Sequence, residues 1–235
     1  MCHVISTNEE LLLLLDSLLR DEGRFWDDFY ENREREIPFF VNAPDCSLVR
    51  WLDEISLGGK RVLELGCGPG RNAIYLAQQG FSVTAVDLSS TALEWAKERM
   101  VECQVEVDFR LQSIFELSDL ADASFDLIYD AGCLHHIPPH RRSSYLAVLH
   151  RLLKPEGHIG LVCFRPEAGS GLTDKEVYIE RSMKGGLGFT EDQLRSIFAP
   201  EFAVEEISQM KEYAKEDSFF GRSFLWTALF RRNLG

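Results

Sequence analysis

Residues 61–72 read RVLELGCGPGRN, and this stretch decides the fold. Its apolar first half predicts a buried strand. Its glycines Gly66, Gly68 and Gly70 predict a tight turn, and the residues from Asn72 onward predict a helix. Glycine adopts backbone angles that a Cβ forbids, and it lets a ligand approach the main chain closely. A strand, a tight turn and a helix N-terminus in this order predict a site for a nucleotide-like ligand.

The spacing of the glycines separates the classes of nucleotide ligand. A dinucleotide fingerprint needs a glycine where Arg71 stands, and the Gly-Lys-Ser/Thr of a phosphate-binding P-loop is absent from the sequence. The pattern that begins at Glu64 is E-x-G-x-G-x-G, which resembles the first motif of class I S-adenosylmethionine (SAM) methyltransferases. The resemblance implies that the glycines, with Cys67 between them, admit the methionine portion of SAM and that Glu64 orients the loop. The alternative, a turn that only packs the helix on the strand, stays open.

An acid ends the next predicted strand, which covers residues 81–87. In a doubly wound sheet the carboxyl end of the second strand lies beside the first, so Asp87 is placed to accept hydrogen bonds from both ribose hydroxyls. The alternative is a cap on the following helix, which is the weaker interpretation because Ser89 and Ser90 already offer caps. Leu88 is expected to pack against the adenine ring.

The adenine contact is less clear from the residues. Residues 105–111 predict a third strand, after which many SAM methyltransferases carry an Asp that bonds the adenine amino group. Here the chain has Gln112, Ser113 and Ile114 instead. The resemblance therefore assigns Ser113 or Gln112 to the amino group and Ile114 to the ring.

Residues 124–139, SFDLIYDAGCLHHIPP, predict a fourth strand that ends at the same edge. The segment resembles its equivalent in the thiopurine and tellurite-resistance methyltransferases. It lacks the Asn/Asp-Pro-Pro-Tyr/Phe and Pro-Cys signatures of DNA methylation. Asp130, His135 and His136 are the predicted acceptor-side residues, and a histidine with a near-neutral pKa suits a general base. At least one histidine is expected to be structural, and Asp130 has a second interpretation as a partner of the methionine amino group. No third ligand is placed by spacing, so no metal site is predicted.

The N-terminal residues predict a helix over 7–22, started by the capping box of Thr7 and Glu10 and ended at Gly23. Its leucine stripe favours packing on the domain over a lid or a homodimer contact. Residues 24–46 then mix aromatic and charged side chains, with a W-D-x-x-Y-like run at 26–30. That run resembles the N-terminal lid of the same small-molecule methyltransferases, and aromatic faces attract a sulfonium cation. Packing and a lid are equally favoured for the predicted substrate-facing set, Trp26, Tyr30, Phe39 and Phe40.

The second half of the chain completes the sheet. The segment L-L-K-P-x-G, followed by an apolar strand at 158–164, resembles class I methyltransferases. Residues 165–189 predict an irregular insertion that shapes the substrate pocket, with Arg165 either holding an acidic substrate or facing solvent. Two strands at 202–210 and 223–231 predict a closing antiparallel pair. The expected fold is therefore α/β, a Rossmann-like doubly wound seven-stranded sheet that is mostly parallel, with an antiparallel C-terminal strand.

Composition narrows the partners. The net charge is −13 over 235 residues, which opposes nucleic acid and anionic membrane surfaces despite a basic cluster of Arg141, Arg142, Arg151 and Lys154. The six cysteines form no CxxC pair and predict reduced core thiols in a cytoplasmic protein. No stretch is long and apolar enough to predict a membrane span.

These observations predict an enzyme that transfers a methyl group from SAM to a small-molecule acceptor by in-line displacement, leaving S-adenosylhomocysteine. Residues 1–44 are expected to form a helical extension and lid, and residues 45–235 the SAM-dependent methyltransferase domain. Two alternatives stay open: a SAM-binding sensor or partner module without catalysis, and a nicotinamide-dependent oxidoreductase.

Overall fold

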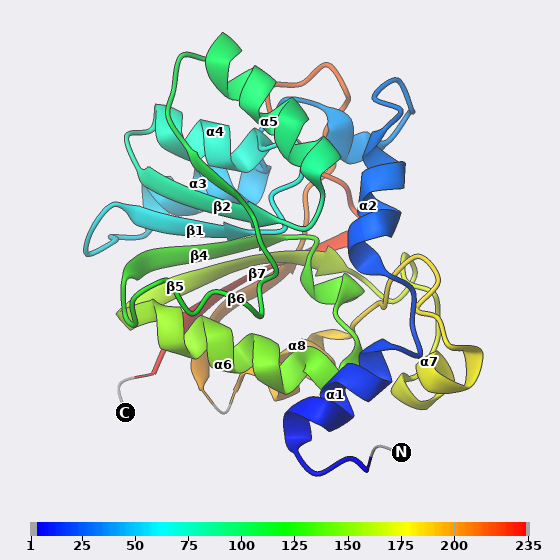
Figure 1. Ribbon diagram of the computed structural model, residues 1–235. Helices are drawn as coiled ribbons and strands as arrows, with labels where there is room; N and C mark the ends of the chain where they lie inside the picture. The colour runs from blue at the N-terminus through cyan, green and yellow to red at the C-terminus, as the bar shows by residue number, and fades with distance from the viewer. Residues whose placement is uncertain (1–3, 200, 234–235) are drawn as a thin grey trace.

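A seven-stranded sheet forms the centre of the computed structural model, which describes residues 4–199 and 201–233 (Figure 1). Its strands lie in the order β3-β2-β1-β4-β5-β7-β6. Neighbouring strands run parallel, except that β7 is antiparallel to both β5 and β6. The expected doubly wound, mostly parallel sheet with an antiparallel C-terminal strand is confirmed. The strands are β1 (Arg61–Leu65), β2 (Ser82–Asp87), β3 (Asp108–Leu111), β4 (Phe125–Ala131), β5 (Leu153–Phe164), β6 (Phe202–Gln209) and β7 (Leu225–Arg232).

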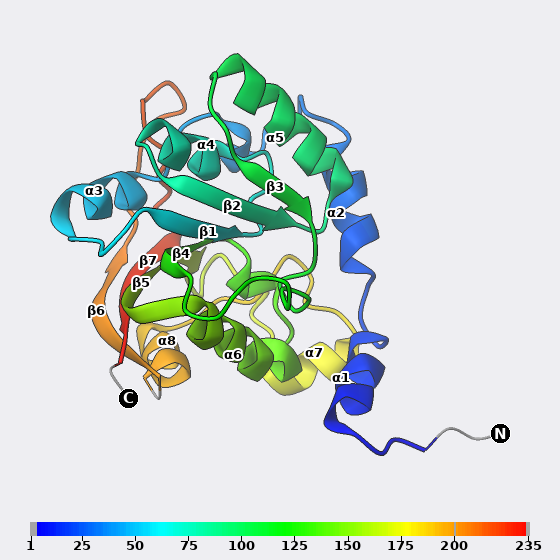
Figure 2. The same ribbon diagram turned by 60° about the vertical axis from the view of Figure 1, so that its left-hand side comes forward.

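Helices cover both faces of the sheet, as Figures 1 and 2 show. α3, α4 and α5 lie on one face, and α6 and α8 lie on the other. α2 passes across the edge at which the parallel strands end, and α1 lies beside α7 (Figure 2). The helices are α1 (Asn8–Asp16), α2 (Glu22–Tyr30), α3 (Cys46–Glu54), α4 (Arg71–Gln78), α5 (Ser90–Glu102), α6 (Arg142–Leu152), α7 (Asp174–Glu180) and α8 (Glu191–Phe198), with short 3-10 turns η1 (Pro38–Phe40), η2 (Leu134–His136) and η3 (Pro139–Arg141).

The order of strands reverses at β1. Leu65, the last residue of β1, is paired with Val86 on one side and with Asp130 on the other. Leu63 and Leu65 are fully buried between the helical layers. In open α/β sheets ligands bind in the crevice outside the carboxyl ends of the strands at such a switch point. The glycine turn after Leu65 therefore opens into this crevice.

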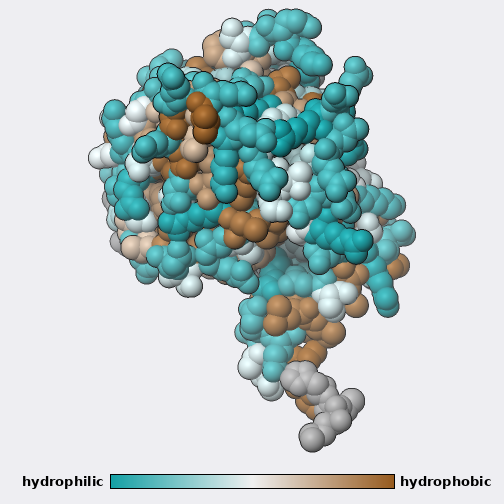
Figure 3. Space-filling view, turned by 45° about the horizontal axis from the view of Figure 1, so that its top comes forward, coloured by the Kyte–Doolittle hydropathy of each residue, from teal (hydrophilic) through white to brown (hydrophobic). Residues whose placement is uncertain are grey.

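The N-terminal helix differs from the expectation. The capping box of Thr7 and Glu10 is present, but α1 ends at Asp16, and a second helix starts after Asp21, whose carboxylate accepts the Arg24 N–H. Gly23 therefore lies inside α2 and does not end a helix. The leucine stripe is only partly core, because no residue of α1 is buried and Leu11 is 43% exposed, whereas Leu19, after the helix, packs partly buried against the core. Figure 3 shows this N-terminal segment standing out from the body with apolar groups on its surface.

Two further elements depart from the predicted pattern. α7 lies inside the segment expected to be irregular, and the capping box formed by Thr173 and Glu176 is the sequence signal for it. β5 begins at Leu153 rather than at the predicted His158, because Leu153 pairs with Phe125 before the register shifts. The expected antiparallel closing pair is present as β6 and β7.

Glycine is required throughout the turn after β1. Gly66, Gly68 and Gly70 have φ of +62°, +51° and +76°, where other L-residues are strained. Gly70 is also tightly enclosed, because a Cβ there would lie 2.8 Å from the ring of Phe109 and 3.0 Å from the Cβ of Ala96. The turn thus allows β3 and α5 to approach the start of α4.

We predict that Gly70→Ala lowers the free energy of unfolding more than Gly171→Ala does. Gly171 has a similar φ of +73°, but nothing lies within 4 Å of the Cβ that the change would add. The control should lose only the left-handed strain of about 1–2 kcal/mol, whereas Gly70→Ala adds an overpacking cost of about 1–3 kcal/mol. Urea unfolding measures both variants, and equal losses would contradict the enclosed packing at Gly70.

Candidate functional site

A cavity of ≈ 500 Å³ opens at the carboxyl ends of the parallel strands. Its wall comes from α2 and η1, the glycine turn, the loop after β4 and the segment before β7. Of the predicted site residues, it is lined by Glu64, Gly66, Cys67, Gly68, Asp87, Leu88, Ser113, Ile114, His135, His136, Trp26, Tyr30 and Phe39. The other four, Gly70, Asp130, Phe40 and Arg165, are not among the lining residues.

Asp87 joins the ends of β1 and β2. Its Oδ2 accepts the Gly68 N–H at 2.7 Å, and its Oδ1 accepts the Ser89 N–H at 2.8 Å. The Leu88 backbone N–H is a third donor to this carboxylate, and since a carboxylate offers about four acceptor positions, some capacity stays available for a hydroxyl of a ligand. Asp87 is not the cap of the next helix, because Ser89 is the N-cap of α5 and accepts the Ala92 N–H.

Glu64 is buried beside the turn, and its Oε2 has no hydrogen-bond partner among the described residues. Burial raises its pKa to about 8, although nearby Arg71 opposes this shift. Arg71 is itself paired with Asp45, whose Oδ1 lies 2.7 Å from the guanidinium. Glu64 lines the cavity, where a cation or a donor on a ligand would satisfy the unpartnered oxygen.

The sequence did not indicate the polar cluster behind Glu64. Asp45 is fully buried, and its Oδ2 accepts hydrogen bonds from Asn72 at 3.0 Å and from the Tyr129 hydroxyl at 2.7 Å. Arg71 also donates to the Ala43 carbonyl. In the sequence Arg71 signified only a missing glycine, whereas in the structure it ties the start of α4 to the segment before α3.

Asp130 points away from the cavity and supports the loop after β4. Its carboxylate accepts the N–H groups of Cys133 at 2.7 Å and Leu134 at 3.0 Å, together with the Tyr145 hydroxyl at 2.7 Å. Burial raises its pKa to about 6, and these donors oppose the shift. The structure does not bring Asp130 to the acceptor side or to a methionine amino group, because its oxygens are turned into the core. It acts on the site by holding the loop that carries the histidines.

His135 and His136 lie side by side, with ring centroids 4.4 Å apart. The His135 ring stacks on Phe164, and the His136 ring meets Trp26 edge to face. Each Nδ1 is buried without a hydrogen-bond partner in the described chain. Burial lowers the pKa of His136 to about 3, with Arg20 adding to the effect, and burial also lowers that of His135 well below its usual value. Both imidazoles are therefore uncharged near neutral pH.

The aromatic N-terminal segment closes one side of the cavity. Trp26 and Tyr30 reach the cavity from α2, and the Tyr30 hydroxyl would lie 2.8 Å from a Cβ on Gly68. Phe39 also lines the cavity, whereas Phe40 packs beneath it against Tyr30 and Trp95. The residues of this segment therefore differ in position. Trp26, Tyr30 and Phe39 line the cavity, as a lid would, whereas Phe40 packs in the core.

One carboxylate fastens α2 to the domain. Asp27 Oδ1 accepts hydrogen bonds from the Ser89 hydroxyl at 2.8 Å and from the Thr91 N–H at 3.1 Å. Ser89 in turn donates its N–H to Asp87. The position of α2 is thus linked through Ser89 to the carboxylate at the end of β2.

Arg165 lies outside the cavity. It donates to the Ser223 carbonyl at 2.8 Å, pairs with Glu167 at 2.7 Å and stands over the Trp226 ring. The expectation that it holds an acidic substrate at the mouth of the pocket is therefore not met by its position, because its charge is compensated elsewhere.

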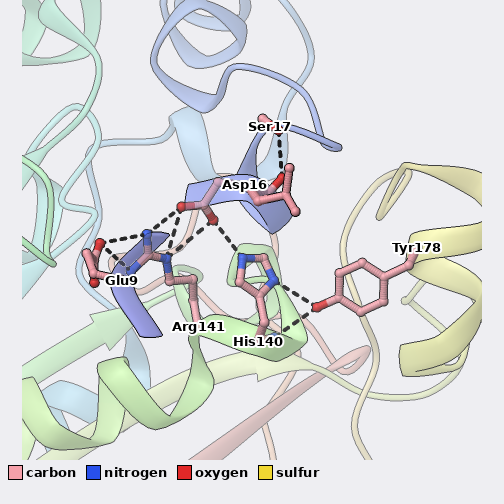
Figure 4. A network of polar contacts seen from close by, with 7 residues as sticks. Glu9, Asp16, Ser17, His140, Arg141 and Tyr178 are labelled. Carbon is pink, nitrogen blue, oxygen red and sulfur yellow. Dashed lines mark hydrogen bonds and ion pairs between the residues drawn. The ribbon is translucent and has the colours of Figure 1, made fainter. Parts of the chain in front are cut away.

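A second polar cluster fastens α1, as Figure 4 shows. The His140 ring bridges Asp16, at 2.8 Å, and the Tyr178 hydroxyl, also at 2.8 Å. Arg141 pairs with Asp16 and Glu9. These contacts join α1, η3 and α7, and η3 follows directly after the histidine loop.

The basic cluster noted in the sequence is paired with acids throughout. Its members form the ion pairs Arg141–Asp16, Arg142–Asp174, Arg151–Asp122 and Lys154–Asp126. Five of the six cysteines are free thiols, and Cys2 lies outside the described residues. Among the described helices, none is long and apolar enough to cross a bilayer.

Comparisons with known proteins match the part of the chain that carries this site. Residues 62–157 match a family model described as a methyltransferase domain. This stretch holds the glycine turn, Asp87 and both histidines. Residues 62–157 therefore carry a methyltransferase domain.

The relatives of this methyltransferase domain are partial matches. The ubiquinone biosynthesis O-methyltransferase of Pseudomonas aeruginosa (strain LESB58) is 35% identical over 141 residues, which is 59% of this chain and 56% of the relative. The chain spans about half the length of the curated relatives it matches.

Solved structures share the fold. The 1,6-didemethyltoxoflavin-N1-methyltransferase of Burkholderia thailandensis, solved with S-adenosylhomocysteine, has a TM-score of 0.64 at 22% identity and covers 100% of this chain and 94% of its own. TehB from Haemophilus influenzae has a TM-score of 0.59 at 20% identity and covers 80% of this chain and 62% of its own. At these identities the likeness concerns the fold alone.

We predict that Glu64→Gln stabilises the ligand-free protein at alkaline pH. The unfolded carboxyl loses its proton near 4.5, but the folded one keeps it until about 8. The contribution of Glu64 to the free energy of unfolding is therefore full below pH 4.5. It falls as the pH rises from there to about 8, and the total loss is on the order of a few kcal/mol. Urea unfolding between pH 5 and 9 should show that the free energy of unfolding of the variant rises relative to that of the wild type as the pH increases. Parallel curves for the two proteins would contradict a buried protonated Glu64.

We also predict that Asp27→Ala speeds the release of S-adenosylhomocysteine, because α2 would lose its hydrogen bonds to the start of α5. The expected increase is on the order of tenfold, corresponding to the loss of hydrogen bonds to a charged group. Asp28→Ala is the matched control, since Asp28 is exposed on the same helix. Stopped-flow displacement measures the rates. Equal rates in the two variants would show that Asp27 does not hold the lid.

Proposed function

We propose that this protein transfers a methyl group from SAM to a small-molecule acceptor. The observation that supports this best is one cavity that joins three chemically distinct groups. These are the unpartnered Glu64 oxygen beside the glycine turn, the spare acceptor positions of Asp87, and the uncharged pair His135 and His136. The first two groups suit SAM, and the third stands where an acceptor would lie.

The residues present fit SAM. Gly66 and Gly68 leave the main chain open to the methionine portion, and Glu64 Oε2 offers an acceptor to its ammonium group. Asp87 would receive the ribose hydroxyls. The adenine would lie among three further lining residues, Leu88, Ser113 and Ile114. When bound, SAM supplies a sulfonium methyl that is already activated for displacement.

The protein contributes positioning and the exclusion of water. α2 covers the cavity through Trp26 and Tyr30, and Asp130 fixes the loop that carries the histidines. One uncharged imidazole can accept a hydrogen bond from the acceptor hydroxyl and take its proton as the methyl group is transferred, when the oxygen becomes strongly acidic. Because burial lowers the pKa of both rings, neither removes the proton beforehand, and the second ring supports its neighbour by packing. A soft thiolate would need no such base.

The comparisons favour oxygen as the acceptor atom. The relatives that match over the domain are named ubiquinone biosynthesis O-methyltransferases. We therefore place an oxygen acceptor ahead of the sulfur, selenium or tellurium acceptors suggested by the thiopurine and tellurite resemblance. Catalysis is favoured over a non-catalytic SAM-binding module because His135 and His136 line the same cavity as the predicted SAM site.

We expect no nucleic-acid partner, because the basic cluster around Arg141 is paired with acids. A homodimer through the N-terminal helix stays a prediction. The leucines that α1 exposes are Leu11, Leu13 and Leu14. Two further statements stay predictions. One is the division into an N-terminal extension with a lid at 1–44 and a catalytic domain at 45–235, and the other is the cytoplasmic location.

We predict saturable binding of SAM and none of NAD in parallel calorimetric titrations. Asp87→Ala should weaken SAM binding by about 1–3 kcal/mol, because the ribose would lose hydrogen bonds in a buried site. Asp87 also holds the turn, so circular dichroism and thermal unfolding must first show that the variant is folded. Unchanged SAM affinity in a folded variant would remove the ribose assignment. NAD binding without SAM binding would overturn the proposed function in favour of an oxidoreductase.

A further inference from the structure

We propose that the acceptor is an uncharged molecule with a flat aromatic body, and that its reacting hydroxyl lies at His135 and His136. This inference rests on the proposed function and adds the chemical class of the acceptor. It follows from three features of the acceptor end of the cavity, which is the part lined by the histidines, Trp26, Phe164 and Arg20.

The first feature is that each arginine lining the cavity has an acid partner. Arg20 forms two hydrogen bonds with the Glu22 carboxylate, at 2.8 and 3.1 Å. Arg71, at the opposite end, is paired with the buried carboxylate of Asp45 at 2.7 Å. Within the described part of the chain the lining therefore offers no uncompensated cation to an anionic acceptor. A carboxylate that moves from water into this cavity would lose its hydration without gaining a counter-ion, which is strongly unfavourable.

The second feature is the state of the histidines. Both imidazoles are uncharged, so neither serves as a counter-ion for an acid. Each ring lines the cavity, and a neutral imidazole has one donor nitrogen and one acceptor nitrogen, so the nitrogen that meets an acceptor is one or the other. A hydroxyl can both donate and accept, so it satisfies either arrangement. The polar groups at this end thus match one neutral hydroxyl group better than they match an anion.

The third feature is the aromatic wall. Trp26 reaches over His136 from α2, and Phe164 stacks against His135 from the end of β5, with ring centroids 3.7 Å apart. Phe25 and Phe224 line the same region. Aromatic side chains pack best on flat rings, in stacked or edge-to-face arrangements. The cavity wall therefore favours a planar body next to the reacting hydroxyl.

The reaction of such an acceptor keeps the charge in the cavity constant. A bond forms between the acceptor oxygen and the methyl carbon. The carbon–sulfur bond breaks with its electron pair left on sulfur, and the hydroxyl proton passes to an imidazole nitrogen. One positive charge is present before the transfer and one after it. An uncharged acceptor therefore reacts without bringing a further charge into an apolar region.

A pair of catechols that differ in one charge tests the inference. Methyl 3,4-dihydroxybenzoate is uncharged in its side group, and 3,4-dihydroxybenzoate carries a carboxylate. Titration of each into the full chain saturated with S-adenosylhomocysteine should show the ester binding at least about tenfold more tightly, a difference of about 1.4 kcal/mol. Equal or tighter binding of the acid would overturn the inference, as would failure of both compounds to bind.

Turnover separates this inference from the proposed function. With SAM in place of the product, release of S-adenosylhomocysteine should follow the same order of acceptors. If the ester binds but is not methylated, and no other acceptor is, the proposed methyl transfer fails while the acceptor site stands. If methylation proceeds with the acid in preference to the ester, the proposed function stands and the acceptor class is wrong.

A charge variant tests the role of the Arg20–Glu22 pair. Glu22→Gln removes the counter-ion of Arg20 and should move the ratio of the two dissociation constants at least about fivefold toward the acid. Glu31→Gln makes the same change of charge at an exposed position outside the cavity lining and should leave the ratio unchanged. An unmoved ratio in a folded Glu22→Gln protein would contradict the placement of Arg20 at the acceptor end.

Discussion

The hydrogen bond from the Gly68 N–H to Asp87 is the contact on which the site depends. It ties the turn after β1 to the end of β2, at the point where the order of strands reverses. The turn can reach Asp87 only because Gly68 adopts a left-handed conformation. From Asp87 the connection continues through Ser89 to Asp27, which holds α2. One short series of contacts thus sets the distance between the sheet and the helix that covers it.

Burial of charge explains much of the remaining arrangement. Beneath the turn, Asp45 forms an ion pair with Arg71 and accepts a hydrogen bond from the Tyr129 hydroxyl. Glu64 keeps one oxygen without a partner. Burying a polar group without a hydrogen bond is costly, and the ligand-free protein bears this cost at the place where a ligand would relieve it. Glu64 therefore lowers the stability of the ligand-free protein, and the same unpartnered oxygen favours the binding of a ligand that donates to it.

Local patterns explain which features could be predicted from the sequence. The glycine turn, the acid at the end of β2 and the antiparallel finish depend on spacing and alternation, and all three are visible in the chain. The roles of Asp130 and Arg165 depend on partners distant in sequence. Asp130 meets Tyr145 and the backbone of its own loop, and Arg165 meets Ser223. The break between α1 and α2 depends on Asp21 starting a second helix, which the leucine pattern concealed.

The position of Tyr30 has a consequence for the timing of the reaction cycle. Its hydroxyl stands directly against Gly68, so the covering helix and the turn share one narrow space. If ligand exchange beside this turn requires α2 to move aside, that motion would limit the rate, as lid motions do in many enzymes. With such a motion limiting, different acceptors at saturating concentration would share one maximal rate, and they would differ only in the concentration that reaches half of it.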